Sequence, residues 1–475
     1  METVKKKIDF TNGKVFFKIL YFILPIVATN LLQVFYNAAD MMVVSLSSEA
    51  NAKAAIGVTV SFLHLIVNSI IGFSVGTNVV VARAIGSKDD KRITRAVHTS
   101  VIMSVLFGGA AMIFGVIVAR PILKWMGTTG NLLELAVTYT FFYFLGVPFM
   151  AMTNYLSSIF RAKGDSKTPL LVLSSAGVLN VLCNLFFVLV LGLSVEGVAI
   201  ATAIANAVSA IVLLTILSRA KDSTKFSFKK LKIHRGAFRD IIVVGLPAGV
   251  QSALFSLSNV LIQSSIIAVN NSLVSADVVY QPVVDGNAAA ANLDGFVYTS
   301  MNAVTQGALT FTSQNMGAKK TERVRRIMWA SFGLVTAIGL LMGGLTTIFL
   351  KPLLSLYGIA PNAQDALAQL AYETAHTRCM YICLPYFVCG LMEIAGAVLR
   401  GIGKSLFSAI IALVGACLLR VVWLATAFAA WPSLETIYII YPISQTVTAV
   451  FTFIVVEIVL RKILKAKGES VTAEE

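Results

Sequence analysis

Twelve long apolar segments recur along this chain of 475 residues, separated by short charged breaks. A helix needs roughly 20 mostly apolar residues to cross the hydrocarbon core of a membrane, and each segment reaches that length. Hydrophobic side chains make up 57% of the residues and charged ones only 13%, with a mean hydropathy of +0.82, which excludes an ordinary soluble domain. The predicted spans are 15–46, 55–82, 94–119, 132–158, 168–191, 196–218, 240–269, 291–315, 326–350, 367–398, 405–430 and 436–460.

The distribution of positive charge predicts how these spans are oriented. Of the 38 Lys and Arg residues, 32 fall in the segments predicted to be inner, whereas Arg420 lies inside a span. Five are predicted to be outer: Lys53, Arg120, Lys124, Lys351 and Arg378. The positive-inside rule then predicts a multi-pass membrane protein with both termini cytoplasmic. The basic inner loops are expected to meet anionic lipid, and nothing in the chain predicts nucleic-acid binding.

The two halves of the chain repeat the same residues at nearly constant offsets. Leu24 and Pro25 return as Leu246 and Pro247. A second group of pairs shares a sequence separation slightly larger than that between Pro25 and Pro247: Gly76/Gly307, Gly86/Gly317, Arg92/Arg323, Pro121/Pro352 and Gly127/Gly358. The separation is larger still for Arg161/Arg400 and Gly164/Gly403. Each repeat holds six crossings, an even number, so both enter the bilayer in the same orientation.

Parallel repeats of this kind build alternating-access transporters, in which a cavity lies between two six-helix bundles. We therefore expect an all-α integral membrane fold of twelve transmembrane helices in two lobes, a parallel 6+6 repeat. The expected parts are a cytoplasmic N-terminus (1–14), an N-lobe (15–218), a basic cytoplasmic linker (219–239), a C-lobe (240–465) and a cytoplasmic tail (466–475).

Several strings resemble the multidrug and toxic compound extrusion (MATE) family. They are the stretch from Leu24 to Asp40, the run Arg161 to Pro169 and the run Gly197 to Thr202. The run Gly286 to Phe296, together with Glu393 and Arg420, resembles its bacterial DinF-like and MepA-like branch. The major facilitator superfamily also has a 6+6 arrangement, but the loop from Gly86 to Arg95 lacks its Asp-Arg-x-Gly-Arg-type signature.

This resemblance implies a V-shaped pair of lobes with a central cavity and cation-coupled export of organic compounds, driven by protons or sodium. It also implies an N-lobe cation site formed by the span-one Asp40 with Asn180, Asn184 and Thr202. The position of Asn184 is commonly Asp in the family. With one carboxylate instead of two, the site would give Na⁺ a single formal charge, which favours a proton as the coupling ion. Glu196 is a second carboxylate that either adds to this site or simply ends span six.

Asp40 is also the sharpest candidate from the residues alone. Placing a charged side chain in the membrane interior costs roughly 2.5 kcal/mol or more of free energy. Each such residue therefore indicates either a function or a partner that offsets this cost. Asp40 follows Lys18 by about 33 Å along a helix, so it is predicted in the outer half of the first span. A buried carboxylate there can carry a proton, or hold Na⁺ if other oxygens converge on it. Asn180 and Asn184 share one helix face and reach a similar depth.

The second half supplies a separate set of polar candidates for substrate binding or a C-lobe site. It comprises Gln251, Asn259, Gln263, Asn292, Asp294, Glu393 and Arg420. We expect Glu393 and Arg420 to pair, because an isolated buried charge is costly. The pair has either a structural role or a role in gating and binding. Asp294 either caps the helix that it opens or takes part in binding.

The leading functional prediction is a secondary active exporter of amphipathic organic compounds or drugs, with a proton favoured over sodium. One alternative is a lipid-linked oligosaccharide flippase of the same superfamily, which would line its cavity with several Arg or Lys to hold a pyrophosphate. An intramembrane enzyme is disfavoured, because four scattered His residues offer no catalytic cluster and no HExxH. No P-loop motif is present. We expect no cofactor and no resident metal, and we expect a monomer.

Overall fold

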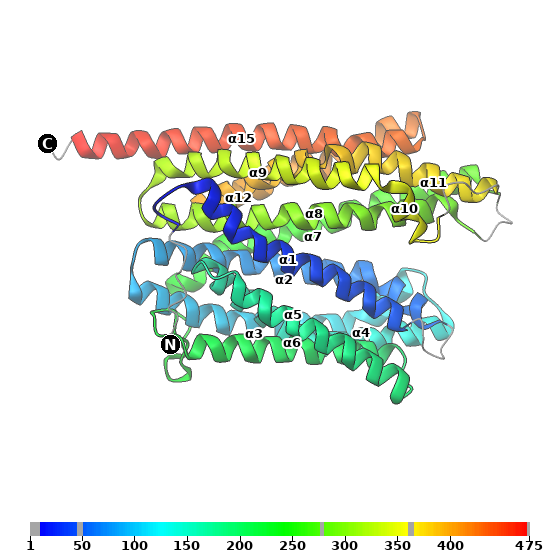
Figure 1. Cartoon of the computed structure of the whole chain (residues 1–475), viewed down its shortest axis with the longest axis horizontal. Coiled ribbons are helices and arrows are strands. Elements are labelled where there is room, and N and C mark those ends of the chain that lie inside the picture. Colours follow the sequence, from blue (N-terminus) through cyan, green and yellow to red (C-terminus); the bar gives the residue numbers. More distant parts are fainter. Residues whose placement is uncertain (1–9, 45–50, 276–279, 360–364, 473–475) are drawn as a thin grey trace. The chain divides into compact units, whose positions relative to one another are not determined.

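The computed structural model describes residues 10–44, 51–275, 280–359 and 365–472. Their secondary structure is almost entirely helical (Figure 1). The first half contains α1 (Val15–Val44), α2 (Ala52–Gly86), α3 (Asp90–Trp125), α4 (Gly130–Ala162), α5 (Lys167–Leu185) and α6 (Val195–Ser218). The second half contains α7 (Arg235–Leu273), α8 (Pro282–Gly317), α9 (Thr321–Ile348), α10 (Leu350–Ser355), α11 (Ala366–Arg378), α12 (Phe387–Ile402), α13 (Ser405–Ala412), α14 (Leu419–Trp423) and α15 (Leu434–Thr472).

These helices form twelve transmembrane rods in the described residues, six from each half of the chain, as predicted. α11 and α12 are joined by π-helical and 3₁₀ turns into one rod, and α13 and α14 form another with π-helical turns. Within the described part of the chain, ten rods are long and apolar enough to cross a membrane. The other two, α8 and α15, are 36 and 39 residues long.

Equivalent residues of the two repeats end or bend equivalent helices. Gly164 follows α4 with φ of 85°, and Gly403 follows α12 with φ of 92°, a left-handed conformation that favours glycine. Pro25 lies inside α1 and Pro247 inside α7, where a missing N–H weakens the helix locally. The repeat seen in the sequence is therefore a repeat of backbone conformation.

The chain packs into two compact units. Unit 1 holds the described residues before α1, then Tyr21–Ala253 and Thr310–Lys320. In it, α4 is the central helix and packs against α2, α3 and α6. Most side chains of its apolar core are Val, Ile, Leu, Phe and Ala from these helices.

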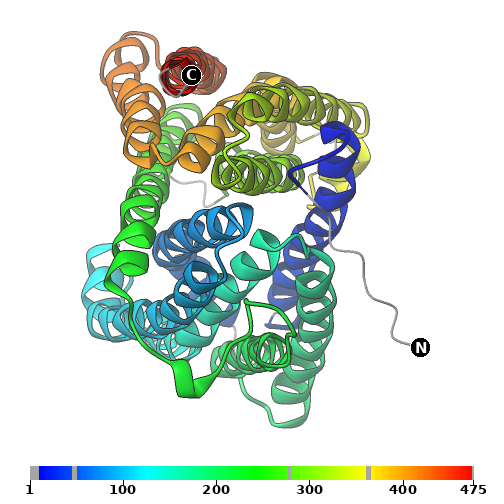
Figure 2. The ribbon, with the colours of Figure 1, turned by 90° about the vertical axis from the view of Figure 1, so that its left-hand side faces the viewer.

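Unit 2 holds Val15–Leu20, Leu254–Leu309 and Thr321–Glu475. In this unit α12 packs against α9 and α15. Figure 2 views the helices nearly end-on, with the carboxyl end of the chain nearest the reader. α7 and α8 each begin in one unit and end in the other, so the units divide the chain at other residues than the predicted lobes do.

One prediction about helix ends was wrong, and its correction excludes one of the two alternatives for Asp294. The connection between spans seven and eight was expected from Asn270 to Ala290, but α7 continues to Leu273 and α8 already begins at Pro282. Asp294 therefore lies well inside α8 and cannot cap it. The small polar and alanine residues from Gly286 onward looked like a loop because their hydropathy is low, yet alanine is the strongest helix former.

Candidate functional site

The four residues predicted as a cation-coupling site meet in unit 1. Asp40 comes from α1, Asn180 and Asn184 from consecutive turns of α5, and Thr202 from α6. We call these four residues the Asp40 cluster. Asn184 donates its side-chain N–H to Asp40 Oδ1 at 2.5 Å. The Asn184 side chain is fully buried, and its Oδ1 has no hydrogen-bond partner among the described residues.

The amide of Asn180 links the carboxylate to α6. In the orientation that satisfies both ends of the amide, its nitrogen donates to Asp40 Oδ1 at 2.8 Å and its oxygen accepts from the Thr202 hydroxyl at 3.3 Å. Two amide donors thus point at one carboxylate oxygen. In the part of the chain that the structure describes, no cationic side chain forms an ion pair with Asp40.

A close contact between α1 and α5 positions this cluster. Tyr36, one turn before Asp40, donates its hydroxyl to the backbone oxygen of Ser174 at 3.0 Å. Its ring lies against Gly177, where an added Cβ would come within 1.8 Å of Tyr36 Cε2. Only glycine allows this approach, because real Cβ atoms do not come that close to a neighbour. Gly177 therefore sets the distance between Asp40 and the two asparagines.

Other polar groups of unit 1 divide into those near Asp40 and those that serve the fold. The hydroxyls of Tyr139 and Tyr143 on α4 lie within electrostatic range of the Asp40 carboxylate. Glu196 lies in the first turn of α6 and accepts a hydrogen bond from the backbone N–H of Ser194 at 3.2 Å. This contact fits the interpretation of Glu196 as an end residue of the helix.

A second polar cluster lies inside unit 2 and is centred on an ion pair. Arg378 at the end of α11 contacts Asp294 of α8, with its Nη2 2.7 Å and its Nε 2.8 Å from Asp294 Oδ2. Cys383 contributes an S–H···O contact to Asp294 Oδ1 at 2.6 Å. Both charged side chains are buried, at 10% and 5% exposure. Arg378, which was counted with the outer residues, lies at the end of α11 inside a helical rod.

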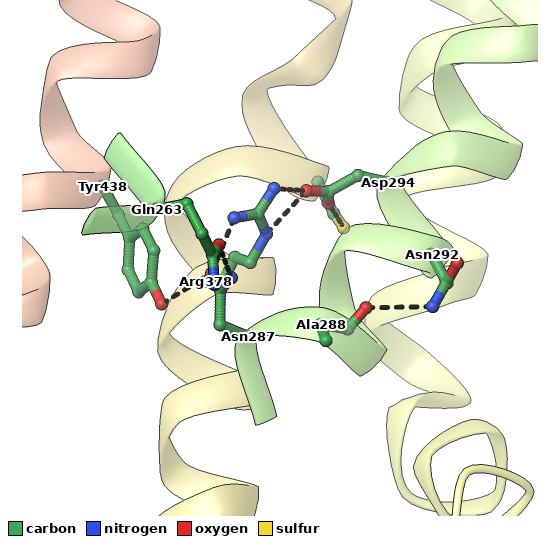
Figure 3. Close-up of polar contacts among 8 residues, drawn as sticks. Gln263, Asn287, Ala288, Asn292, Asp294, Arg378 and Tyr438 are labelled. Carbon is green, nitrogen blue, oxygen red and sulfur yellow. Dashed lines mark hydrogen bonds and ion pairs between the residues drawn. The ribbon is translucent and has the colours of Figure 1, made fainter. Parts of the chain in front are cut away.

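Amide and phenol groups complete this network (Figure 3). Asn287 Oδ1 accepts from Arg378 Nη1 at 2.7 Å and from the Tyr438 hydroxyl at 3.1 Å. Asn287 Nδ2 donates to Gln263 Oε1 at 3.1 Å. We call Gln263, Asn287, Asp294, Arg378 and Tyr438 the Asp294 cluster. It ties four rods of unit 2 together through one neutralised pair of charges.

The remaining polar candidates of the second half do not join this cluster. In Figure 3 the side chain of Asn292 turns away from Arg378, and it donates to the backbone oxygen of Ala288 at 3.0 Å. Asn259 is exposed. Gln251 is buried, but it belongs to unit 1. Of the three predicted α7 residues, only Gln263 is part of the Asp294 cluster.

The expected ion pair of Glu393 with Arg420 is not the one that forms. Glu393 pairs with Arg400, about two turns further along its own helix, at 3.5 Å. Arg420 is buried, donates to Ser444 Oγ at 3.2 Å and lies over the Tyr441 ring at 4.3 Å from its centroid. Neighbouring spans with opposite charges suggested the wrong partner, because an arginine on the same face of the same helix satisfies Glu393.

Three members of the Asp294 cluster were missed as candidates, namely Asn287, Arg378 and Tyr438. Arg378 was missed because it was counted with the outer basic residues, although it falls within the predicted span 367–398. Asn287 was quoted only as part of a motif. The signal for Asn287 was its spacing, because Asn287 and Asp294 are seven residues apart and thus share a face of α8.

Comparisons with known proteins agree with this fold. The MatE family model matches residues 25–186 and 247–426. The chain is 27% identical over 403 residues to "Probable multidrug resistance protein YoeA" of Bacillus subtilis (strain 168), covering 82% of each chain. It is 25% identical over 431 residues to "Probable multidrug resistance protein YpnP" of the same organism, covering 90% of this chain and 91% of YpnP.

A solved structure described as "Outward-facing conformation of a multidrug resistance MATE family transporter of the MOP superfamily" has the same fold. It superimposes with a TM-score of 0.87 at 19% identity, covering 98% of this chain and all of the other. The family match spans both repeats and includes Asp40, Asn180 and Asn184, as well as Asp294 and Arg378. The chain belongs to the MatE family.

Proposed function

We propose that this protein is a proton-coupled exporter of amphipathic organic compounds, working as a monomer in the cytoplasmic membrane of a bacterium with both termini cytoplasmic. Its membership of the MatE family and its similarity to proteins named as probable multidrug resistance proteins support efflux as the activity. The observation that carries the proposal is Asp40, a carboxylate held by neutral amides without an ion pair in the described residues.

In this proposal the Asp40 cluster works as a charge switch. The amides of Asn184 and Asn180 both donate to the ionised carboxylate, so they stabilise its charged form. Protonation cancels the half-buried charge and weakens these two hydrogen bonds, which hold α1 against α5. α1 contains Pro25, where the helix is able to bend. A proton thereby changes which arrangement of α1 is stable, which is the requirement for coupling.

The composition of the cluster favours a proton over sodium. Na⁺ needs several oxygen ligands, and the cluster offers the carboxylate of Asp40, the unpartnered Oδ1 of Asn184 and the hydroxyl of Thr202. It supplies a single negative charge to balance the ion. A carboxylate alone is enough for a proton, so the two ions make different demands on Asn184.

The flippase alternative is supported less well. A pyrophosphate group needs several unpaired cationic side chains. Arg378 and Arg400 are buried, but each is neutralised by a carboxylate of its own unit. Arg420 forms no ion pair among the described residues, and one such side chain falls short of a pyrophosphate site.

The direct test is efflux of a fluorescent organic cation from proteoliposomes under an imposed proton gradient or an imposed sodium gradient. We expect the wild type to respond to the proton gradient and Asp40→Asn to lose this response. Glu196→Gln is the matched control, because Glu196 is a carboxylate of the same repeat outside the cluster. Asn184→Asp should add a response to sodium, since it gives the site a second charge. Proton-driven efflux by Asp40→Asn at the wild-type rate would refute the proposal.

A further inference from the structure

Within unit 1, α2 and the end of α8 touch backbone to backbone. A Cβ added at Gly86 would lie 2.0 Å from the carbonyl oxygen of Gln314, and one added at Gly317 would lie 2.1 Å from the carbonyl oxygen of Arg83. Contacts under 3.0 Å are essentially never made by real Cβ atoms. Both positions therefore require glycine as long as this contact is closed.

The contact is reciprocal between the two repeats. Gly86 and Gly317 are equivalent positions of the repeats, and Arg83 and Gln314 are equivalent at the same offset. The same turn of each repeat thus supplies a glycine to its counterpart and accepts the counterpart's glycine on a carbonyl. Such self-complementary exchange is the pattern of a two-fold interface. Here it forms inside one chain.

The turns that follow this contact share a strained backbone. Lys88 has φ of 56° and Lys319 has φ of 57°, and they are the non-glycine residues with positive φ in the described part of the chain. They too are equivalent at the offset that relates Gly86 to Gly317. A left-handed non-glycine residue costs free energy and persists where the surrounding structure enforces it.

Neighbouring hydrogen bonds secure the same region. Gln314 Nε2 donates to the backbone oxygen of Ala162 at 2.7 Å. The Thr310 hydroxyl donates to Asn78 Oδ1 at 3.1 Å, and Asn78 Nδ2 donates to the backbone oxygen of Ser158 at 3.3 Å. These groups are buried, so the contact excludes water. The close approach is a sealed interface between the two repeats.

We propose that Gly86 and Gly317 form a reciprocal seal at the end of α2 and α8 that carries the loops 87–89 and 318–320, the end predicted to be cytoplasmic. The seal holds α2 against the end of α8 in this structure, and it separates when the protein takes up a compound from that side. Glycine at both positions lets the two backbones meet again. The opening of the seal during uptake rests on the proposed transport function, but the contact itself is testable without transport.

The test is hydrogen–deuterium exchange of the full chain in lipid, followed in peptides that cover residues 76–90 and 310–322. Either Gly86→Ala or Gly317→Ala forces the seal apart, so we expect exchange to rise about tenfold or more in both peptides. The rise in the peptide that carries no substitution is the decisive result. Gly109→Ala and Gly333→Ala are the matched controls, because an added Cβ there meets nothing within 4 Å.

The proposal also makes a prediction for the unmodified chain, which holds even if an alanine variant fails to fold. The two wild-type peptides should exchange together, with one shared opening rate. Independent exchange of the two peptides, or a rise confined to the substituted helix, would overturn the seal. No ion gradient is applied, so failure of this test is distinct from failure of Asp40 as the proton carrier.

Discussion

Each repeat holds an aspartate among amides and hydroxyls, Asp40 half-buried and Asp294 buried, yet the two clusters are built on opposite principles. Asp40 accepts hydrogen bonds from neutral asparagines and forms no ion pair in the described residues. Asp294 is held by the guanidinium of Arg378 through two contacts, at 2.7 Å and 2.8 Å. One cluster therefore keeps an unbalanced charge, and the other carries almost none.

This difference predicts different roles for the two clusters: the Asp40 cluster is a charge switch, and the Asp294 cluster is a structural brace of unit 2. A carboxylate that is held by neutral amides has a less stable charged form than one beside a counter-ion, so gaining a proton or a cation changes its energy strongly. A buried carboxylate beside arginine keeps its charge, and removing either partner leaves the other without compensation. We therefore expect the Asp40 cluster to respond to ions and the Asp294 cluster to hold unit 2 together.

The largest effect is expected from removing the arginine of the brace. Arg378→Gln leaves Asp294 as an uncompensated buried charge, which should lower the free energy of unfolding by about 3–5 kcal/mol. Thermal unfolding in detergent measures this. The double variant Arg378→Gln with Asp294→Asn should recover much of the loss, because both charges are then gone. Equal instability of the single and double variants would contradict the ion pair as the cause.

A smaller effect is expected from Asn287, for which another asparagine of the same helix, Asn292, serves as the control. Asn287→Ala removes the acceptor of both Arg378 and Tyr438 and should cost about 1–3 kcal/mol in the same assay. Asn292→Ala is the matched control, because Asn292 contacts only a backbone oxygen of its own helix; it should stay within about 0.5 kcal/mol of the wild type. Similar losses in both variants would contradict the contacts in Figure 3, because Asn292 would then contribute as much as Asn287.

The smallest change in stability is expected for the switch. Asp40→Asn replaces a half-buried unpaired charge by a neutral group of the same shape, so the free energy of unfolding should change by less than about 1 kcal/mol or increase. The same variant should lose proton-driven efflux. A loss of stability as large as that of Arg378→Gln would make Asp40 a brace as well and remove the contrast between the repeats.

The sequence predicted the repeat from local rules, and the resemblance to the MATE family implied the four residues of the Asp40 cluster, with helix geometry in agreement. Span length and the positive-inside rule gave twelve crossings, and all twelve rods are found in the described residues. Asn180 and Asn184 share a face because they are four residues apart on one helix. Their distance along the helix predicted that they lie at the same membrane depth as Asp40, since all spans cross the same thickness of membrane.

The Asp294 cluster and the partner of Glu393 were not predictable in this way. The partner of Arg378 could not be predicted, because Asp294 is 84 residues away in the sequence. Glu393 had two arginines within reach, and hydropathy does not rank Arg400 against Arg420. Pairing of buried charges is decided by the rotation and depth of packed helices, which the pattern of apolar residues leaves free.

The sequence by itself thus determined the number of rods, their repeat and the residues that share a helix face, because these follow from chain length and helical period. Only the tertiary structure decided which charges are neutralised and which backbones touch. The contacts of Arg378 with Asp294 and of Gly86 with Gln314 join residues far apart in the chain. Such contacts depend on distances of a few ångströms between helices, and these are set by the packing of all side chains together.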